Sequence, residues 1–123
     1  MIARMSRAVI VVDDDPVFRG LARRILNACG LDVVGEASTV RDALETAAAL
    51  EPDAFLVDVG LPDGDGIDLA QQLTAMPWHP RVVLTSSDPD AATQKDVRRT
   101  GARGFIPKDE LPNAPLEELL DTG

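Results

Sequence analysis

Four apolar runs end directly in a polar patch, and this pattern limits the possible folds more than any other feature of the chain. The runs AVIVV, AFLV, VVL and GFIP precede Asp13, Asp58, Thr85 and Lys108, respectively. Such continuous apolar runs are typical of buried parallel strands. Ligands of open α/β sheets bind at the carboxyl ends of the strands, so we expect the four patches to meet in one crevice. Carboxylates, a hydroxyl and an ammonium group together would suit a divalent cation and a phosphoryl group.

Helix signals alternate with the strand signals, which predicts a parallel sheet with helices on both faces. We expect strands near residues 8–12, 31–36, 54–57, 81–84 and 103–106, and helices near 16–29, 39–50, 67–76, 89–100 and 113–120. Asp15 and Asp88 each precede a proline and are expected to cap helices, and Thr39 with Asp42 resembles a capping box. The helix near 89–100 has few apolar residues, so we expect it to be weakly docked and able to move in switching.

Composition narrows the class of protein. With 123 residues the chain forms one domain, and its net charge of −9 predicts that this domain by itself is repelled by nucleic acid and by anionic membrane. Its one cysteine, Cys29, allows no internal disulfide, which fits a reducing cytoplasm. No apolar stretch approaches the ~20 residues of a membrane span, and the first residues do not form a signal peptide. We therefore expect a cytoplasmic protein without a membrane partner.

Asp13, Asp14 and Asp58 are the candidate acidic groups. Asp13 and Asp14 are adjacent, and like charges this close raise each other's pKa unless a cation neutralises them. Mg²⁺ prefers oxygen ligands, although the pair could equally be a charged helix N-terminus. Asp58 has no basic neighbour in sequence and could accept a phosphoryl group as a covalent acyl phosphate, or cap the next helix. The carbonyl of Gly60 could serve the same cation.

Thr85 and Lys108 complete the candidate set. The Thr85 hydroxyl could donate to a phosphoryl oxygen, and the Lys108 ammonium is a compact charge that suits a phosphate or a carboxylate. Taken singly, each is more often a structural or a solvated surface residue. Their shared position at strand ends is what favours a common function.

The segments VIVVDDDP, FLVDVGLPDGDG, VVLTSS and GARGFIPK resemble the receiver domains of two-component response regulators, over nearly the whole chain. The resemblance implies a flavodoxin-like doubly wound (βα)5 fold with a parallel five-stranded sheet in the order 2-1-3-4-5. It implies a receiver domain over residues 5–121, with no output domain in this chain. The pattern GARGFIPK, followed by Asp109 where many receivers have proline, resembles receivers attached to helix-turn-helix output domains.

The resemblance also assigns roles to residues. Asp58 would be the phosphoacceptor, and Thr85 and Lys108 would act with it. The Mg²⁺ ligands would be Asp14, Asp58 and the carbonyl of Gly60, with Asp13 acting largely through water. Thr85 and Phe105 would be the switch residues, although Phe105 could equally be a plain core residue.

The resemblance implies a signalling switch rather than an enzyme acting on a separate substrate. The phosphoryl group would come from a sensor histidine kinase or a phosphotransfer protein, because the lone His79 lies between prolines and is a poor donor. The domain would be a stand-alone relay or the N-terminal part of a transcriptional regulator, and would reach DNA only through an output domain. A homodimer through the fourth helix, fifth strand and fifth helix is possible.

Three other interpretations compete with this one. The run VVDDDPV also satisfies the nucleophile motif of haloacid-dehalogenase-type phosphatases, with Asp13 and Asp15, but this leaves Asp58 unexplained and the chain lacks room for cap insertions. The run PDGDGID is rich in acids but fails the EF-hand spacing. A receiver-like interaction module that no longer takes up phosphoryl groups is the third alternative.

Overall fold

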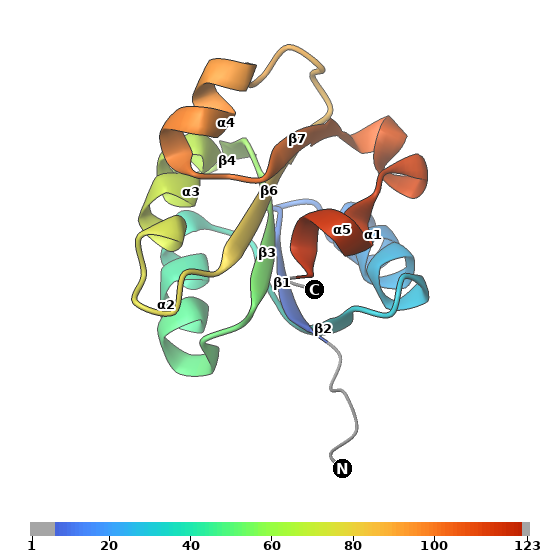
Figure 1. Cartoon of the computed structure of the whole chain (residues 1–123), viewed down its shortest axis with the longest axis horizontal. Helices are drawn as coiled ribbons and strands as arrows, with labels where there is room; N and C mark the ends of the chain where they lie inside the picture. The colour runs from blue at the N-terminus through green and yellow to red at the C-terminus, as the bar shows by residue number, and fades with distance from the viewer. Residues whose placement is uncertain (1–6, 122–123) are drawn as a thin grey trace.

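The computed structural model describes residues 7–121 and shows a five-stranded parallel sheet at the centre of the domain (Figure 1). The strand order is β2-β1-β3-β6-β7. This confirms the predicted order, because β6 and β7 are the fourth and fifth strands of the sheet. The strands are β1 (Ala8–Val12), β2 (Asp32–Ala37), β3 (Ala54–Asp58), β6 (Arg81–Ser86) and β7 (Gly104–Pro107).

Helices cover both faces of the sheet (Figure 1). They are α1 (Pro16–Ala28), α2 (Val40–Leu50), α3 (Gly66–Thr74), α4 (Gln94–Thr100) and α5 (Leu116–Leu120), with a 3₁₀ helix, η1 (Lys108–Asn113), before the last. One core lies between the sheet and α1, η1 and α5, and a second lies between the sheet and the α2–α3–α4 side. Within residues 7–121 no helix is long and apolar enough to cross a membrane.

The strands form because their side chains are buried on both faces. Every residue of β3 is buried, as are Val9 to Val12 of β1, so near-continuous apolar runs were the correct signal. The predicted caps of the first two helices are confirmed. The Asp15 side chain accepts a hydrogen bond from the Val17 amide, and Thr39 accepts one from the Asp42 amide.

The predicted start of the fourth helix was wrong. The helix begins at Gln94, where Thr93 and Asp96 form a complete capping box. Asp88 instead accepts a hydrogen bond from the Asp90 amide, which closes a local turn. This hydrogen bond satisfies the Asp90 amide without a helix. Of the residues in α4 only Thr100 is buried, which agrees with weak docking.

The two strands of a short hairpin and the 3₁₀ helix η1 were not predicted. The loop after Asp58 contains a small antiparallel hairpin of β4 (Gly60–Leu61) and β5 (Gly64–Asp65). The predicted helix from residue 113 is shorter and begins at Leu116, after η1. Asp109 and Glu110 occupy the first turn of η1, where acidic side chains are favourable. Asp109, the residue that follows Lys108, therefore lies in a helical turn.

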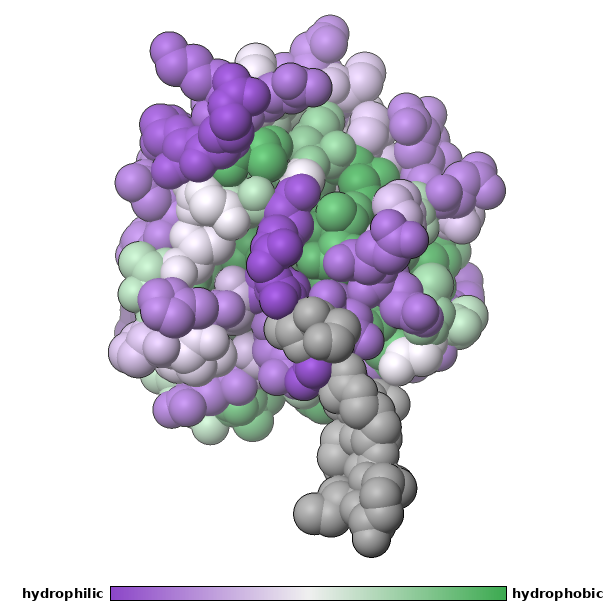
Figure 2. All heavy atoms as spheres, viewed as in Figure 1, coloured by the Kyte–Doolittle hydropathy of each residue, from purple (hydrophilic) through white to green (hydrophobic). Residues whose placement is uncertain are grey.

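Figure 2 shows hydrophobic residues gathered over β7, between the hydrophilic surface of α4 and the C-terminal helices. Two grooves adjoin Phe105 on this face. One, of about 380 Å³, lies between α4 and β7, and the other, of about 360 Å³, lies between β7, η1 and the start of α5. Phe105 itself is half-buried.

Candidate functional site

The candidate residues converge at the carboxyl edge of the sheet. Asp13 follows β1, Asp58 ends β3, Thr85 lies at the end of β6 and Lys108 follows β7. The three strands β1, β3 and β6 are adjacent in parallel register, with Asp58 directly opposite Thr85. The crevice expected from the apolar runs is therefore present, and Asp14 adds its carboxylate to it.

Three carboxylates form a compact acidic cluster. Oxygen atoms of Asp13, Asp14 and Asp58 all lie within 4.8 Å of one another. Asp13 is fully buried, Asp58 is 6% exposed, and Asp14 is exposed. The Lys108 ammonium lies 2.7 Å from Asp13 Oδ2 and 3.7 Å from Asp58 Oδ2. One ammonium group does not balance three carboxylates, so the donor set fits a divalent metal with oxygen ligands.

Asp13 differs from Asp58 because its two oxygens have closer partners than the Asp58 oxygens, which lie 3.3 Å from the Gly60 amide and 3.7 Å from Lys108. Oδ1 accepts a hydrogen bond of 2.9 Å from the Asp15 amide, and Oδ2 is paired with Lys108. Asp14 and Asp58 offer more open oxygens to a bound cation. This difference favours Asp14 and Asp58 as the residues that could bind a metal directly, and Asp13 as one that could contribute indirectly.

Lys108 is fixed by several groups. Its ammonium lies 4.3 Å from the centre of the Phe18 ring, in addition to its contacts with the carboxylates. Burial lowers the pKa of Lys108, but the hydrogen bond and charge of Asp13 and the charge of Asp58 outweigh burial and leave the pKa above its ordinary value. Lys108 is therefore a permanent cation at the rim of the cluster.

Asp58 is the carboxylate whose acidity is changed most clearly. Burial, followed by the negative charge of Asp13, raises the pKa of Asp58 from 3.8 to about 6, while Lys108 acts in the opposite direction. The Gly60 amide donates a long hydrogen bond of 3.3 Å to Asp58 Oδ1. A raised pKa means that, without a metal, the folded state binds a proton at Asp58 more tightly than the unfolded chain does.

This shift predicts the pH dependence of an Asp58→Asn variant. The folded pKa of Asp58 lies above the unfolded value, so its contribution to stability is full below pH 3.8 and is lost as the pH rises through about 6. Without divalent cations, Asp58→Asn should exceed the wild type in unfolding free energy by about 1–3 kcal/mol at pH 7.5. The difference should shrink as the pH falls from 6 to 4. Urea unfolding of both proteins across this range measures it, and a constant difference would contradict the assignment.

The Thr85 hydroxyl is engaged by the neighbouring strand. Its Oγ1 donates a buried hydrogen bond of 2.7 Å to the carbonyl oxygen of Ile106 in β7. Ile106 directly follows Phe105, so the hydroxyl is tied to the strand that carries the predicted switch aromatic. In this structure the threonine therefore bridges the acidic site and the β7 surface.

The hairpin after Asp58 is held by contacts that the sequence pattern did not indicate. Asp63 accepts hydrogen bonds from the Val40 and Arg41 amides at 2.7 and 3.1 Å, and thereby caps α2 from a distant loop. Gly66 packs directly on the backbone of Asp58 and Val59. Asp63 is far in sequence from the amides that it binds, and Gly66 makes its contact without a side chain. No local sequence pattern could therefore reveal either contact.

Comparisons with known proteins agree with the fold and with the geometry of the site. The sequence matches the family profile of the response regulator receiver domain over residues 9–120. It is 29% identical to the chemotaxis protein CheY of Thermotoga maritima over 115 residues, which cover 94% of this chain and 96% of that protein. It is 40% identical to the DNA-binding transcriptional activator DevR/DosR of Mycobacterium tuberculosis over 106 residues, 85% of this chain and 48% of that protein.

Solved structures show the same relationship. The signal receiver domain of NarL from Mycobacterium tuberculosis superposes with a TM-score of 0.79 at 32% identity, covering 94% of this chain and 98% of that one. The response regulator domain of CheB from Thermotoga maritima gives 0.77 at 27% identity, with 93% of each chain covered. The chain spans 35% and 48% of two of its curated relatives. The profile match and the identities show that this chain belongs to the family of response regulator receiver domains of two-component signal transduction.

Proposed function

We propose that this domain is a phosphorylation-dependent switch that accepts a phosphoryl group on Asp58, with Mg²⁺ as cofactor, from a sensor histidine kinase or a phosphotransfer protein. One observation carries the proposal above all. The nearly buried Asp58 carboxylate lies at a strand end, beside two further carboxylates and 3.7 Å from the Lys108 ammonium. This arrangement supplies a nucleophile, a cation and ligands for a metal in one place.

The residues would share the reaction as follows. An Asp58 carboxylate oxygen attacks the phosphorus atom in line, a new P–O bond forms, and the bond to the donor breaks with its electron pair leaving on the donor. Lys108 stabilises the negative charge on the phosphoryl oxygens. Asp14, Asp58 and the Gly60 carbonyl would hold Mg²⁺ directly, and Asp13 would hold it largely through water. When bound, the metal supplies further positive charge for the phosphoryl oxygens.

The signal would pass through Thr85. To donate to a phosphoryl oxygen on Asp58, its hydroxyl must give up the bond to the Ile106 carbonyl, which exchanges one hydrogen bond worth about 1 kcal/mol for a charge-assisted one. Thr85 and Phe105 would then move together and change the surface formed by α4 and β7. The effect is a shift between two populations of one fold.

The output of the switch follows from that surface. The two grooves beside Phe105 lie where α4, β7 and the C-terminal helices meet, and this face would serve a partner or a second copy of the domain. Two curated relatives, the DNA-binding transcriptional activator DevR/DosR and the putative positive transcription regulator BvgA of Bordetella pertussis, are about twice as long as the matched segment. The domain would act either alone as a cytoplasmic relay or as the regulatory part of a transcriptional regulator, and would reach DNA only through an output domain.

The test is the intact mass of the protein after incubation with acetyl phosphate and Mg²⁺. The wild type should gain one phosphoryl group that alkali and hydroxylamine remove, and Asp58→Asn should gain none. Asp32→Asn is the matched control, because Asp32 is an exposed aspartate at the start of β2, and it should behave as the wild type does. Chelation of Mg²⁺ should abolish the gain in the wild type and in Asp32→Asn.

Each rival interpretation has its own result in this experiment. Steady release of phosphate that does not depend on Asp58 would favour a phosphatase that uses Asp13 and Asp15. The geometry gives this reading little support, since the Asp15 side chain caps α1 by accepting from the Val17 amide. No mass gain in the wild type would favour an interaction module that works without phosphorylation.

A further inference from the structure

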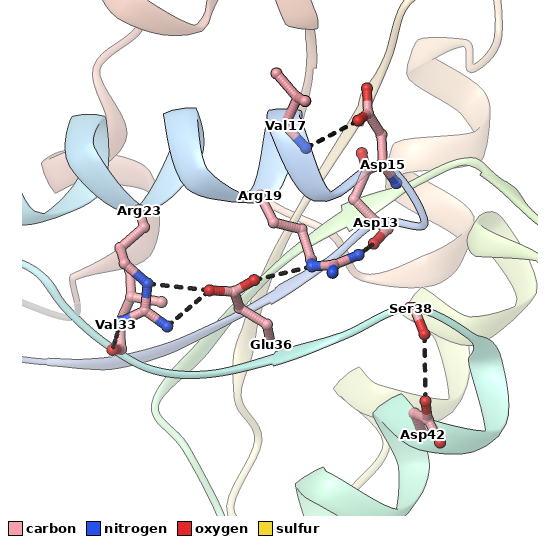
Figure 3. A network of polar contacts seen from close by, with 9 residues as sticks. All are labelled: Asp13, Asp15, Val17, Arg19, Arg23, Val33, Glu36, Ser38 and Asp42. Atoms are coloured by element: carbon pink, nitrogen blue, oxygen red, sulfur yellow. Dashed lines mark hydrogen bonds and ion pairs between the residues drawn. The ribbon is translucent and has the colours of Figure 1, made fainter.

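We infer that Arg19 is a positioning residue for the metal site, and that it acts on Asp14 through the backbone of Asp13. The inference rests on the proposed Mg²⁺ site. The Arg19 guanidinium donates from Nη1 to the Asp13 carbonyl oxygen at 2.7 Å (Figure 3). Its Nε donates to Glu36 Oε1 at 2.8 Å. One side chain of α1 thus joins the loop that carries the acidic pair to the edge strand β2.

This contact orients Asp14 because the carbonyl of Asp13 belongs to the peptide unit that carries the Asp14 amide. The peptide unit is planar, so a hydrogen bond that fixes the carbonyl direction also fixes the direction in which the chain enters Asp14. Asp13 itself has other supports, through the Asp15 amide and Lys108. The Asp14 side chain is exposed, and within residues 7–121 it makes no hydrogen bond that would hold it. Its placement therefore depends on its backbone.

The far end of Arg19 is held by a clamp of opposite charges. Glu36 Oε2 accepts from Arg23 Nε and Nη2 at 3.0 and 2.8 Å, and Arg23 Nη1 donates to the Val33 carbonyl at 3.0 Å (Figure 3). The hydrogen bond from Arg23 is the main cause that holds the pKa of Glu36 below its ordinary value. Arg19 and Arg23 are one helical turn apart on α1 and share one carboxylate, which restricts both guanidinium groups.

Arg19 and Arg23 therefore differ in one respect that an experiment can use. Both bind Glu36 and both bind a backbone carbonyl, but only Arg19 binds the carbonyl of Asp13. Removal of either arginine takes away one of the two guanidinium groups that bind Glu36. Only removal of Arg19 releases the peptide unit before Asp14, so Arg23→Ala is a matched control.

The test is the Mg²⁺ affinity of the full chain, measured by calorimetric titration for the wild type, Arg19→Ala and Arg23→Ala. Arg19→Ala should raise the Kd about tenfold, as is usual when a group behind a metal ligand is removed. Arg23→Ala should stay within about twofold of the wild type. The Kd of Arg19→Lys should lie between those of Arg19→Ala and Arg23→Ala. An ammonium group cannot bind the Asp13 carbonyl and Glu36 in the planar geometry of a guanidinium.

Two further measurements separate positioning from general destabilisation. The urea midpoints of metal-free Arg19→Ala and Arg23→Ala measure how far each substitution destabilises the fold itself. Phosphoryl uptake from acetyl phosphate by Arg19→Ala should be slow at low Mg²⁺ and should approach the wild-type rate at saturating Mg²⁺. Equal Mg²⁺ affinities of the two alanine variants would overturn the inference. A wild-type chain that binds no Mg²⁺ would instead overturn the proposed function on which it rests.

Discussion

Gly66→Ala is expected to lower the free energy of unfolding by at least about 3 kcal/mol, a large part of the roughly 5–15 kcal/mol that stabilises an ordinary domain. A Cβ atom at residue 66 would lie 2.0 Å from the carbonyl oxygen of Asp58 and 2.8 Å from both the Asp58 carbonyl carbon and Val59 Cα. All three are backbone atoms, so no side-chain rotation can relieve the overlap. The Gly66 amide also donates to the Val59 carbonyl at 2.8 Å, which holds the two segments together.

The matched control is Gly20→Ala, at a glycine inside α1 where an added Cβ would meet nothing within 4 Å. Alanine is the better helix former, so this variant should gain about 0.5–1 kcal/mol. Urea unfolding of the two variants and the wild type measures both the loss of stability in Gly66→Ala and the gain in Gly20→Ala. A Gly66→Ala protein that unfolds at the wild-type midpoint would show that the start of α3 does not pack closely against the backbone at the end of β3.

Lys108→Ala is the substitution with the second largest expected effect. Within residues 7–121, Lys108 is the only basic side chain at ion-pair distance from the carboxylates of the acidic cluster. Its removal leaves the fully buried Asp13 carboxylate without the partner that lies 2.7 Å away. Removing one partner of a buried pair is costly because the other charge stays buried. Since Lys108 is itself partly exposed, we expect a loss of about 2–3 kcal/mol at pH 7.5.

Mg²⁺ should reduce this loss, because a divalent cation would replace part of the missing positive charge in the cluster. The control is Lys95→Ala, an exposed lysine of α4 whose removal should change the unfolding free energy by less than about 0.5 kcal/mol. Thermal or urea unfolding with and without Mg²⁺ gives both quantities. Equal stability of Lys108→Ala and Lys95→Ala in the absence of metal would mean that Asp13 is not a buried charge.

Lys108 should also matter to phosphoryl uptake, whereas Lys95 should not. The two lysine variants can be compared in the acetyl phosphate assay at saturating Mg²⁺ and without urea, under conditions where the unfolding curves show both proteins to be folded. Slow uptake by Lys108→Ala alone would separate its contribution to charge stabilisation from its contribution to folding.

The sequence by itself determined the fold class and the place of the site. Apolar runs such as AVIVV and AFLV are buried on both faces, and this burial requires the parallel sheet that was predicted. In such a sheet the residues after each run must meet at one edge, so Asp13, Asp58 and Lys108 could be grouped without coordinates. The alternation of strand and helix signals was equally local, and the caps at Asp15 and Thr39 are read from neighbouring residues.

Boundaries were less well determined where two local signals compete. Asp88 followed by Pro89 is a good helix start, but the capping box of Thr93 and Asp96 satisfies more backbone amides and the helix begins there. In the C-terminal segment, the helix predicted over residues 113–120 begins only at Leu116, after Pro115, and the preceding η1, which contains Pro112, was not predicted.

Only the tertiary structure decided how the acidic residues differ from one another. Asp13, Asp14 and Asp58 are alike as sequence letters, yet one is buried and paired, one is open, and one has a pKa raised to about 6. Those differences arise from burial and from charges on other strands, which no local pattern contains. The same holds for the contacts of Arg19 with Asp13 and of Gly66 with Asp58, because they exist only once helices and strands distant in sequence have packed together.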